Sequence, residues 1–200
     1  MKATEANLLK FLSKSPQFVI PSYQRNYAWT RTECEQLWAD LMRAGRDDNV
    51  KSHFIGAIVY VERAMSNVTN QEPMLVIDGQ QRLTTVTLLI AALAEHRARS
   101  DLGERGELID GFSARKLRNY LLNRDESDER EFRLILSETD RDTLRALLKG
   151  MPDPAKASSR ILENFATFQG LIQPEGRVRR RVQRRPFGQW RGRSVFVVVR

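Results

Sequence analysis

The residues best suited to chemistry form the polar run Asp78–Arg82, with the sequence DGQQR. The run follows the apolar segment Met74–Ile77 and precedes a long segment with helical spacing of apolar residues, so it is expected to turn a strand into a helix. The first N–H groups of a helix have no intrahelical partner, and the helix dipole adds partial positive charge there. Arg82 adds a planar guanidinium that suits phosphate oxygens. The run therefore predicts an anion-binding turn.

Three interpretations of Asp78 stay open. It caps the helix by accepting the N–H of Gln80 or Gln81, it holds a metal ion, or it polarises a water molecule. The turn has one glycine, Gly79, and no Gly-Lys-Ser/Thr ending, which argues against a Walker-type phosphate loop. The density of polar side chains beside apolar segments argues against a purely structural turn, and composition alone leaves both a ligand site and a structural turn open.

A second candidate is the loop Tyr23–Trp29, where Arg25 lies between two tyrosines. Such a loop suits stacking on a base or clamping a phosphate. The alternative is that its aromatic residues anchor in the core while Arg25 pairs with an acid. Gly56 is a third candidate, because a glycine inside a strand often marks close backbone approach by a ligand. His53 alone is more typical of a strand edge than of a catalytic base.

Periodicity and capping signals predict the elements that position these residues. Thr30 and Glu33 form a capping box ahead of a helix. Strands that alternate with helices in the first half, followed by a mainly helical second half, indicate an α/β fold. The expected helices cover residues 4–14, 31–45, 80–99, 113–123, 140–149 and 155–172, and the expected strands cover residues 17–21, 54–62, 74–77 and 132–136.

Composition narrows the class of protein. With 200 residues, 41% of them hydrophobic and 29% charged, the chain can bury a core of one ordinary domain. The apolar stretches are too short to span a bilayer, and residues 1–14 lack the apolar core of a signal peptide, so we expect a cytoplasmic protein with no membrane partner. Cys34 is the single cysteine. Its helical spacing from Leu37, Trp38 and Leu41 predicts a buried thiol rather than a nucleophile.

The net charge of +8 is concentrated at one end of the chain. Residues 177–200 hold nine arginines and no acid, which leaves 24 basic against 25 acidic residues in the first 176. Such a run can bind nucleic-acid phosphates without sequence preference. A disordered basic tail and the product of a reading-frame slip are the alternatives, and we expect the slip. The candidate nucleic-acid contacts are Arg179, Arg180, Arg181, Arg184 and Arg185.

Three ordered motifs resemble one family. The segments Ile20–Trp29 (IPSYQRNYAW), Phe54–Ile58 (FIGAI) and Ile77–Thr85 (IDGQQRLTT) are similar in order and spacing to the N-terminal domain of GmrSD-type, modification-dependent restriction enzymes, also called domain of unknown function 262. The resemblance covers about residues 5–172, and residues 177–200 do not share it. It implies a small mixed-sheet core like that of ParB and sulfiredoxin over residues 1–100, a helical extension of the same domain over 101–173, and an atypical basic tail over 174–200.

The resemblance also implies a function, namely NTP hydrolysis coupled to DNA restriction in phage defence. The implied cofactor is an NTP, with Mg²⁺ as a candidate companion, and no metal site is expected in the protein alone. Family members commonly continue into a His-Asn-His nuclease domain, which this chain is expected to lack, so a separate nuclease domain or subunit is a candidate partner beside DNA. The alternatives are a nucleotide- or DNA-sensing module without turnover and an inactive remnant. The implied catalytic residues are Asp78, Gln81 and Arg82, and the implied nucleotide-binding residues are Gln24, Arg25, Gly56, Asp78, Gly79, Gln80, Gln81 and Arg82.

Overall fold

A mixed sheet forms the frame of the protein in the computed structural model, which describes residues 3–14, 17–47, 49–50, 52–62, 73–99, 112–173 and 194–199. Among these residues the strand order is β1-β6-β3-β4-β2-β5. The pairs β1–β6 and β3–β4 are antiparallel, whereas β6–β3, β4–β2 and β2–β5 are parallel. The strands are β1 (Thr4–Asn7), β2 (Phe18–Val19), β3 (Ser52–Glu62), β4 (Met74–Asp78), β5 (Leu134–Ile135) and β6 (Ser194–Val199).

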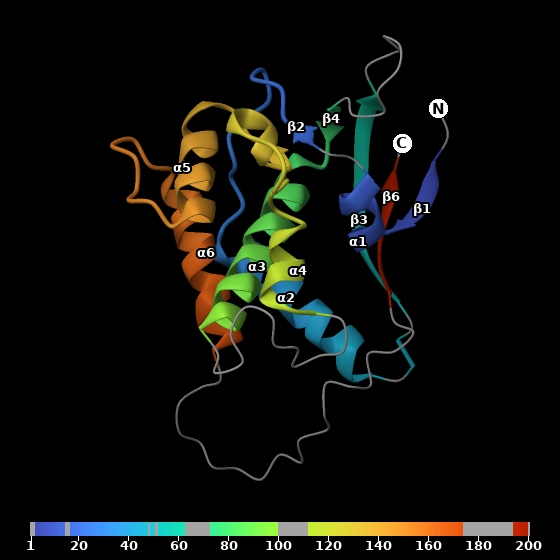
Figure 1. Cartoon of the computed structure of the whole chain (residues 1–200). Helices are drawn as coiled ribbons and strands as arrows, with labels where there is room; N and C mark the ends of the chain where they lie inside the picture. Colours follow the sequence, from blue (N-terminus) through green and yellow to red (C-terminus); the bar gives the residue numbers. More distant parts are fainter. Residues whose placement is uncertain are drawn as a thin grey trace.

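Helices pack beside this sheet, so the predicted α/β class is confirmed. Figure 1 shows α3 in the middle of the helical side, with α4 and α6 next to it, whereas α1 lies near β3 and β6. Thr30 and Glu33 make both bonds of the predicted capping box, which sets the start of α2. The helices are α1 (Leu8–Lys14), α2 (Arg31–Arg46), α3 (Gln80–Ala98), α4 (Ala114–Arg118), α5 (Glu138–Lys149) and α6 (Ser159–Ile172), with a 3₁₀ turn over Asp128–Glu131.

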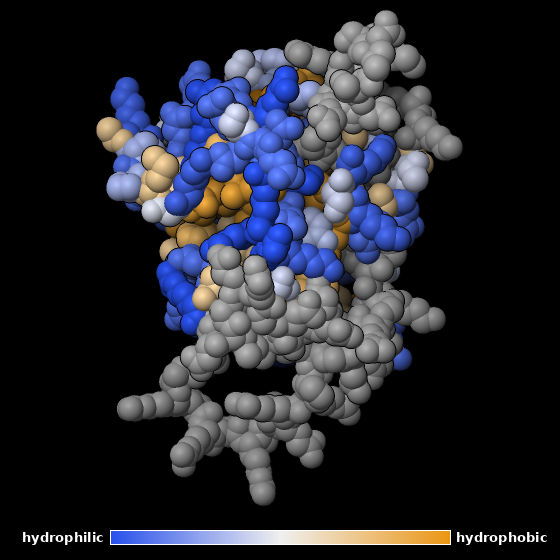
Figure 2. Space-filling model, in the orientation of Figure 1, coloured by the Kyte–Doolittle hydropathy of each residue, from blue (hydrophilic) through white to orange (hydrophobic). Residues whose placement is uncertain are grey.

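Helix α3 is the central element of the core. Leu83, Leu88 and Ala92 are almost fully buried, and apolar residues cover most of its circumference, as expected for a helix enclosed by others. Hydrophilic residues cover most of the described surface visible in Figure 2, and hydrophobic residues show mainly between them. The first turn of α3 is therefore held at the end of β4 by a helix that cannot shift without disturbing the core. Within the described part of the chain, no helix is long and apolar enough to cross a membrane.

Some elements differ from the sequence-based expectation. Residues 4–7 are a strand rather than the start of a helix, because they pair with β6. The helix expected over 113–123 covers only Ala114–Arg118. The strands β2 and β5 have two residues each and depend on parallel pairing with each other and with β4. The strand at residues 4–7 shows that pairing with a distant segment can outweigh local propensity.

The C-terminal segment corrects a further expectation. Residues 194–199 were expected to lie outside the fold, but they form β6, which pairs with β1 on one side and β3 on the other. Their sequence, SVFVVV, is rich in β-branched residues, which favour strands. A tail that lies wholly outside the domain is therefore wrong for this segment. Residues 174–193, including the arginines expected to contact nucleic acid, lie outside the described residues.

A proline in β6 tests whether this strand contributes to stability. Val197→Pro places a proline in a strand that lies between β1 and β3, opposite Ala6 of β1, and proline is disfavoured inside a sheet because it has no N–H to donate. We expect a loss of about 2–3 kcal/mol in the free energy of unfolding by urea. Val197→Thr, which keeps the N–H and the β-branched shape, serves as the control. Equal stability of the two variants would show that β6 is not an integrated strand.

Candidate functional site

The turn between β4 and α3 has an open helix N-terminus. Gly79 is the N-cap residue of α3 with φ 94°, and no side chain caps the helix. Asp78 is exposed, and its Oδ1 accepts the N–H of Gly79 at 2.8 Å. The interpretation of Asp78 as a cap that accepts from Gln80 or Gln81 is therefore wrong. The first N–H groups of α3 have no intrahelical acceptor, so they remain available to an anion.

Gly79 fixes this turn against the neighbouring strand. A Cβ at this position would lie 2.9 Å from the carbonyl oxygen of Ala57 and 3.0 Å from Cα of Ile58, both on the backbone of β3. The positive φ adds a second reason for glycine, since L side chains rarely adopt it. The turn is thus held at a distance from β3 that only a glycine permits.

Arg82 lies across β3 at the second conspicuous glycine. A Cβ on Gly56 would be 2.3 Å from Nε of Arg82, so the absence of a side chain there makes room for the guanidinium arm. Nη1 of Arg82 donates to the carbonyl oxygen of Ala57 at 3.3 Å. The close approach predicted for Gly56 is therefore occupied by an arginine of the DGQQR run. The structure brings these two predicted residues together.

Gln24 and Gln81 use their amides on the protein itself. Nε2 of Gln24 donates to the carbonyl oxygens of Val76 and Ile77, at 2.7 and 3.0 Å, at the end of β4. Gln81 is 8% exposed, and its Oε1 accepts the N–H of Ala28 at 2.8 Å and of Trp29 at 3.2 Å, while its Nε2 donates to the Asn26 carbonyl at 3.2 Å. Both glutamines thus fix the loop 22–29 to the turn, and neither amide points freely into a site.

The aromatic loop Tyr23–Trp29 matches neither of its two interpretations fully, namely a ligand-stacking loop or a loop anchored in the core with Arg25 paired to an acid. Tyr27 is buried and Trp29 is half-buried against the core, whereas Tyr23 is 75% exposed. The hydroxyl of Tyr27 lies 2.7 Å from Oγ1 of Thr85 and accepts a hydrogen bond from Asn164. Burial raises the pKa of Tyr27, so its hydroxyl stays neutral in this network. Arg25 does not pair with an acid among the described residues.

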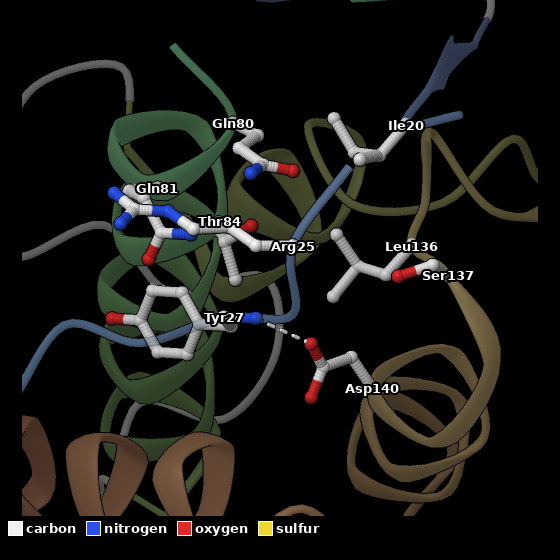
Figure 3. A pocket seen from close by; sticks show the side chains of 9 residues that line it. All are labelled: Ile20, Arg25, Tyr27, Gln80, Gln81, Thr84, Leu136, Ser137 and Asp140. Atoms are coloured by element: carbon white, nitrogen blue, oxygen red, sulfur yellow. Dashed lines mark hydrogen bonds between the residues drawn. The ribbon is translucent and has the colours of Figure 1, made fainter. Parts of the chain in front are cut away.

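Arg25 lies at the edge of a small hollow beside the first turn of α3. The hollow measures about 10 Å³, room for one water molecule. Figure 3 shows the Arg25 side chain extended toward Gln81 and Thr84 of α3, with Asp140 on the opposite wall. In the described part of the chain, no hydrogen-bond partner is found for the guanidinium of Arg25 or the amide of Gln80. The lining residues are Ile20, Arg25, Tyr27, Gln80, Gln81, Thr84, Leu136, Ser137 and Asp140.

Arg25 and Arg82 lie on opposite flanks of the turn. Arg82 contacts β3, on one side of β4, while the hollow at Arg25 includes residues that follow β2 and β5, on the other side. Neither arginine forms an ion pair with a carboxylate in the described ranges. Two unpaired guanidinium groups and a helix N-terminus make this end of α3 electropositive. Asp78 is the acidic residue of the turn itself.

Other candidate groups take no part in this arrangement. Burial raises the pKa of the Cys34 thiol to about 11, so it stays protonated at neutral pH, which confirms the predicted structural cysteine. His53 is half-buried on β3. Among the described residues there is no cluster of three or more His, Cys, Asp or Glu side chains that could hold a metal ion.

The structure also adds two residues to the site that sequence patterns did not indicate. Asp140, on the first turn of α5, accepts the backbone N–H of Tyr27 at 2.6 Å. Asn164, on α6, donates to the Tyr27 hydroxyl at 3.0 Å and to the Trp29 carbonyl at 2.8 Å. Asp140 had a signal only as a residue near a helix start, and Asn164 had none. The helical extension is therefore bonded directly to the loop that carries Arg25.

Two comparisons relate the chain to known proteins. The sequence model of a family described as "GmrSD restriction endonuclease, N-terminal domain" matches residues 8–185. The uncharacterized protein MJ0686 of Methanocaldococcus jannaschii is 33% identical over 92 residues, which cover 40% of this chain and 16% of that protein. The chain thus spans a small part of this relative. The expectation that the family likeness stops before residue 177 is wrong for residues 177–185, because the match includes them.

Proposed function

The chain belongs to the family of the GmrSD restriction endonuclease N-terminal domain, and we propose that it acts there as a module that binds and hydrolyses an NTP at the β4–α3 turn. Membership relates the chain to restriction systems. The family resemblance implies an NTP as the bound molecule, and the chemistry of the turn supports an anionic ligand that carries phosphate groups. We further propose that NTP hydrolysis by this module controls DNA cleavage by a nuclease domain or a separate nuclease subunit.

The open N-terminus of α3, flanked by Arg25 and Arg82, is the observation that carries this proposal. An NTP presents several phosphate oxygens with negative charge, and they need N–H donors and guanidinium groups held in fixed places. The turn offers uncapped backbone N–H groups, one arginine on each flank and the free amide of Gln80. A neutral ligand would leave both guanidinium groups without a countercharge.

The same residues suit phosphoryl transfer to water. In this reaction a water oxygen bonds to the terminal phosphorus, the bond to the bridging oxygen breaks, and an NDP and phosphate leave. Arg82 and Arg25 would neutralise the charge on the phosphate oxygens, and the exposed carboxylate of Asp78 would orient the attacking water. Gln81, assigned to catalysis by family resemblance, would support the site by holding the loop, because its amide is already bonded.

Mg²⁺ fits this site as a companion of the nucleotide rather than as a resident ion. Mg²⁺ is commonly held by one or two carboxylates together with substrate phosphates. Asp78 offers one exposed carboxylate at the turn, and the described residues form no larger acidic cluster there. The ion would neutralise phosphate charge when it arrives with the NTP.

Arg82→Ala tests nucleotide binding. Removing a charge-assisted phosphate contact is expected to cost about 1.5–3 kcal/mol, or about tenfold or more in affinity. Calorimetric titration with ATP, GTP, CTP and UTP in the presence of Mg²⁺ measures it. Arg31→Ala is the matched control, because Arg31 is an exposed arginine that pairs with Glu35 on α2. Equal affinity of wild type and Arg82→Ala would contradict phosphate binding at this turn.

Turnover separates the alternatives within this proposal. A sensing module would bind an NTP and respond to Arg82→Ala, but it would release no phosphate beyond the buffer rate. An inactive remnant would bind none of the four nucleotides. Phosphate release by the purified chain, measured with and without DNA, distinguishes these outcomes from an active NTPase. DNA remains a proposed partner, which the arginines at 179–185 would contact through its phosphates.

A further inference from the structure

Asp140 is a buried carboxylate that accepts a hydrogen bond from the backbone of a distant loop. It lies on the first turn of α5 and is 3% exposed, and its Oδ2 accepts the backbone N–H of Tyr27 at 2.6 Å. The two residues are 113 positions apart in the chain. A buried charge is costly unless it is hydrogen-bonded, and the start of a helix with the Tyr27 N–H supplies favourable partners. The carboxylate is therefore used to hold a loop.

That loop is fixed on both sides of Arg25, and Asp140 supplies one of the bonds on the far side, next to those that Gln81 makes. Gln24 is bonded through its side chain to the carbonyls at the end of β4, and Tyr27 is bonded through its N–H to Asp140. Between these anchors lie Arg25 and Asn26, and the Asn26 carbonyl itself accepts a hydrogen bond from Gln81. Because both ends of this short span are fixed, the direction in which the Arg25 side chain leaves the loop is fixed as well (Figure 3).

Asp140 also leaves Arg25 free to bind an anion. Both side chains line the same hollow, yet they form no ion pair within 4.0 Å. If the carboxylate paired with the guanidinium, the positive charge at the N-terminus of α3 would be neutralised. Because Asp140 instead accepts the Tyr27 N–H, the guanidinium keeps its capacity to bind phosphate.

We propose that Asp140 is a positioning residue for nucleotide binding: it holds the loop at Tyr27 so that Arg25 faces the phosphates at the first turn of α3. This inference rests on the proposed function. The inference gives the helical extension a role in the site. Asp140 on α5 would set the position of Arg25, which lies in the loop 22–29 and not in the extension.

The test compares Asp140→Ala, Arg25→Ala and the double variant by calorimetric titration with ATP, GTP, CTP and UTP and Mg²⁺. Asp140→Ala is expected to weaken binding about fivefold to tenfold. In the Arg25→Ala background the same change should have little further effect, because the residue through which Asp140 acts is gone. Asp140→Asn keeps an acceptor for the Tyr27 N–H and should restore affinity to within about twofold of wild type.

Controls separate positioning from general stability. Glu138→Ala removes the exposed carboxylate from the same helix turn and should leave affinity unchanged. If Asp140→Ala does not fold, Asp140→Glu takes its place in the test. Glutamate keeps the carboxylate charge but moves the oxygen that accepts the Tyr27 N–H. Three results would overturn this inference but not the proposed function. They are unchanged affinity in the Asp140 variant, additive losses of affinity in the double variant, and failure of Asp140→Asn to restore affinity. Failure of wild type to bind any of the four nucleotides overturns the proposed function, and the inference with it.

Discussion

Replacing Asp78 by Asn is expected to reduce NTP hydrolysis by about two to three orders of magnitude while nucleotide affinity changes by less than about threefold. The reason is that Asp78 is exposed beside the open N-terminus of α3, where its charge would act on the attacking water or on Mg²⁺. Asn keeps an oxygen that can accept the Gly79 N–H, the bond that Asp78 makes now. The turn should therefore survive while the charge is lost.

Phosphate release under saturating nucleotide measures the hydrolysis rate, and calorimetry measures affinity on the same protein. Asp153→Asn is the control, since it removes an exposed carboxylate from the loop between α5 and α6. A hydrolysis rate equal to that of an active wild type would mean that Asp78 only shapes the turn. A large loss of affinity with unchanged maximal rate would instead make Asp78 a binding residue.

Gly79→Ala is expected to lower the free energy of unfolding by about 2–5 kcal/mol. We also expect that calorimetry at micromolar protein concentration will detect no nucleotide binding by this variant. Two effects add up. The φ of 94° costs an L residue about 1–2 kcal/mol, and the new Cβ would lie 2.9 Å from the Ala57 carbonyl oxygen. Backbone atoms of β3 cannot rotate away as a side chain can, so the turn itself has to move.

Gly150 provides a matched control for this experiment. It also has a positive φ, 63°, at the C-terminus of α5, but a Cβ there would meet nothing within 4 Å. Gly150→Ala therefore carries the conformational cost without the clash, and we expect a loss of about 1 kcal/mol. Urea unfolding compares the two variants. If their losses are equal, the contact between Gly79 and β3 contributes nothing beyond the backbone angle.

Local signals predicted the parts of the fold whose causes are local. The capping box at Thr30 and Glu33 set the start of α2, and the change from apolar strand to polar turn located the start of α3 to the residue. Strands β1 and β6 were missed because each is defined by pairing with residues far away in the sequence. The abrupt arginine-rich composition before β6 further masked a β-prone segment.

The candidate site likewise combines residues that a local motif reveals with residues whose contacts lie far away in the sequence. Asp78, Gly79 and Arg82 could be found because a strand-to-helix turn concentrates them in five residues. The role of Gln81 could not, because its partners are backbone groups of the loop 26–29, more than 50 residues earlier. Asp140 and Asn164 act on Tyr27 across 113 and 137 residues. No short motif records such contacts.

The place of β6 in the sheet has a consequence for the order in which the protein can form on the ribosome. Among the described strands, β1 is joined to the rest of the sheet only through β6, and β6 is synthesised last of these six. Until residues 194–199 emerge, the edge of β3 has no partner and β1 has nothing to pair with. Such an unpaired edge can recruit strands from other chains. A nascent chain that has formed β3 would therefore expose one edge of this strand until residues 194–199 emerge.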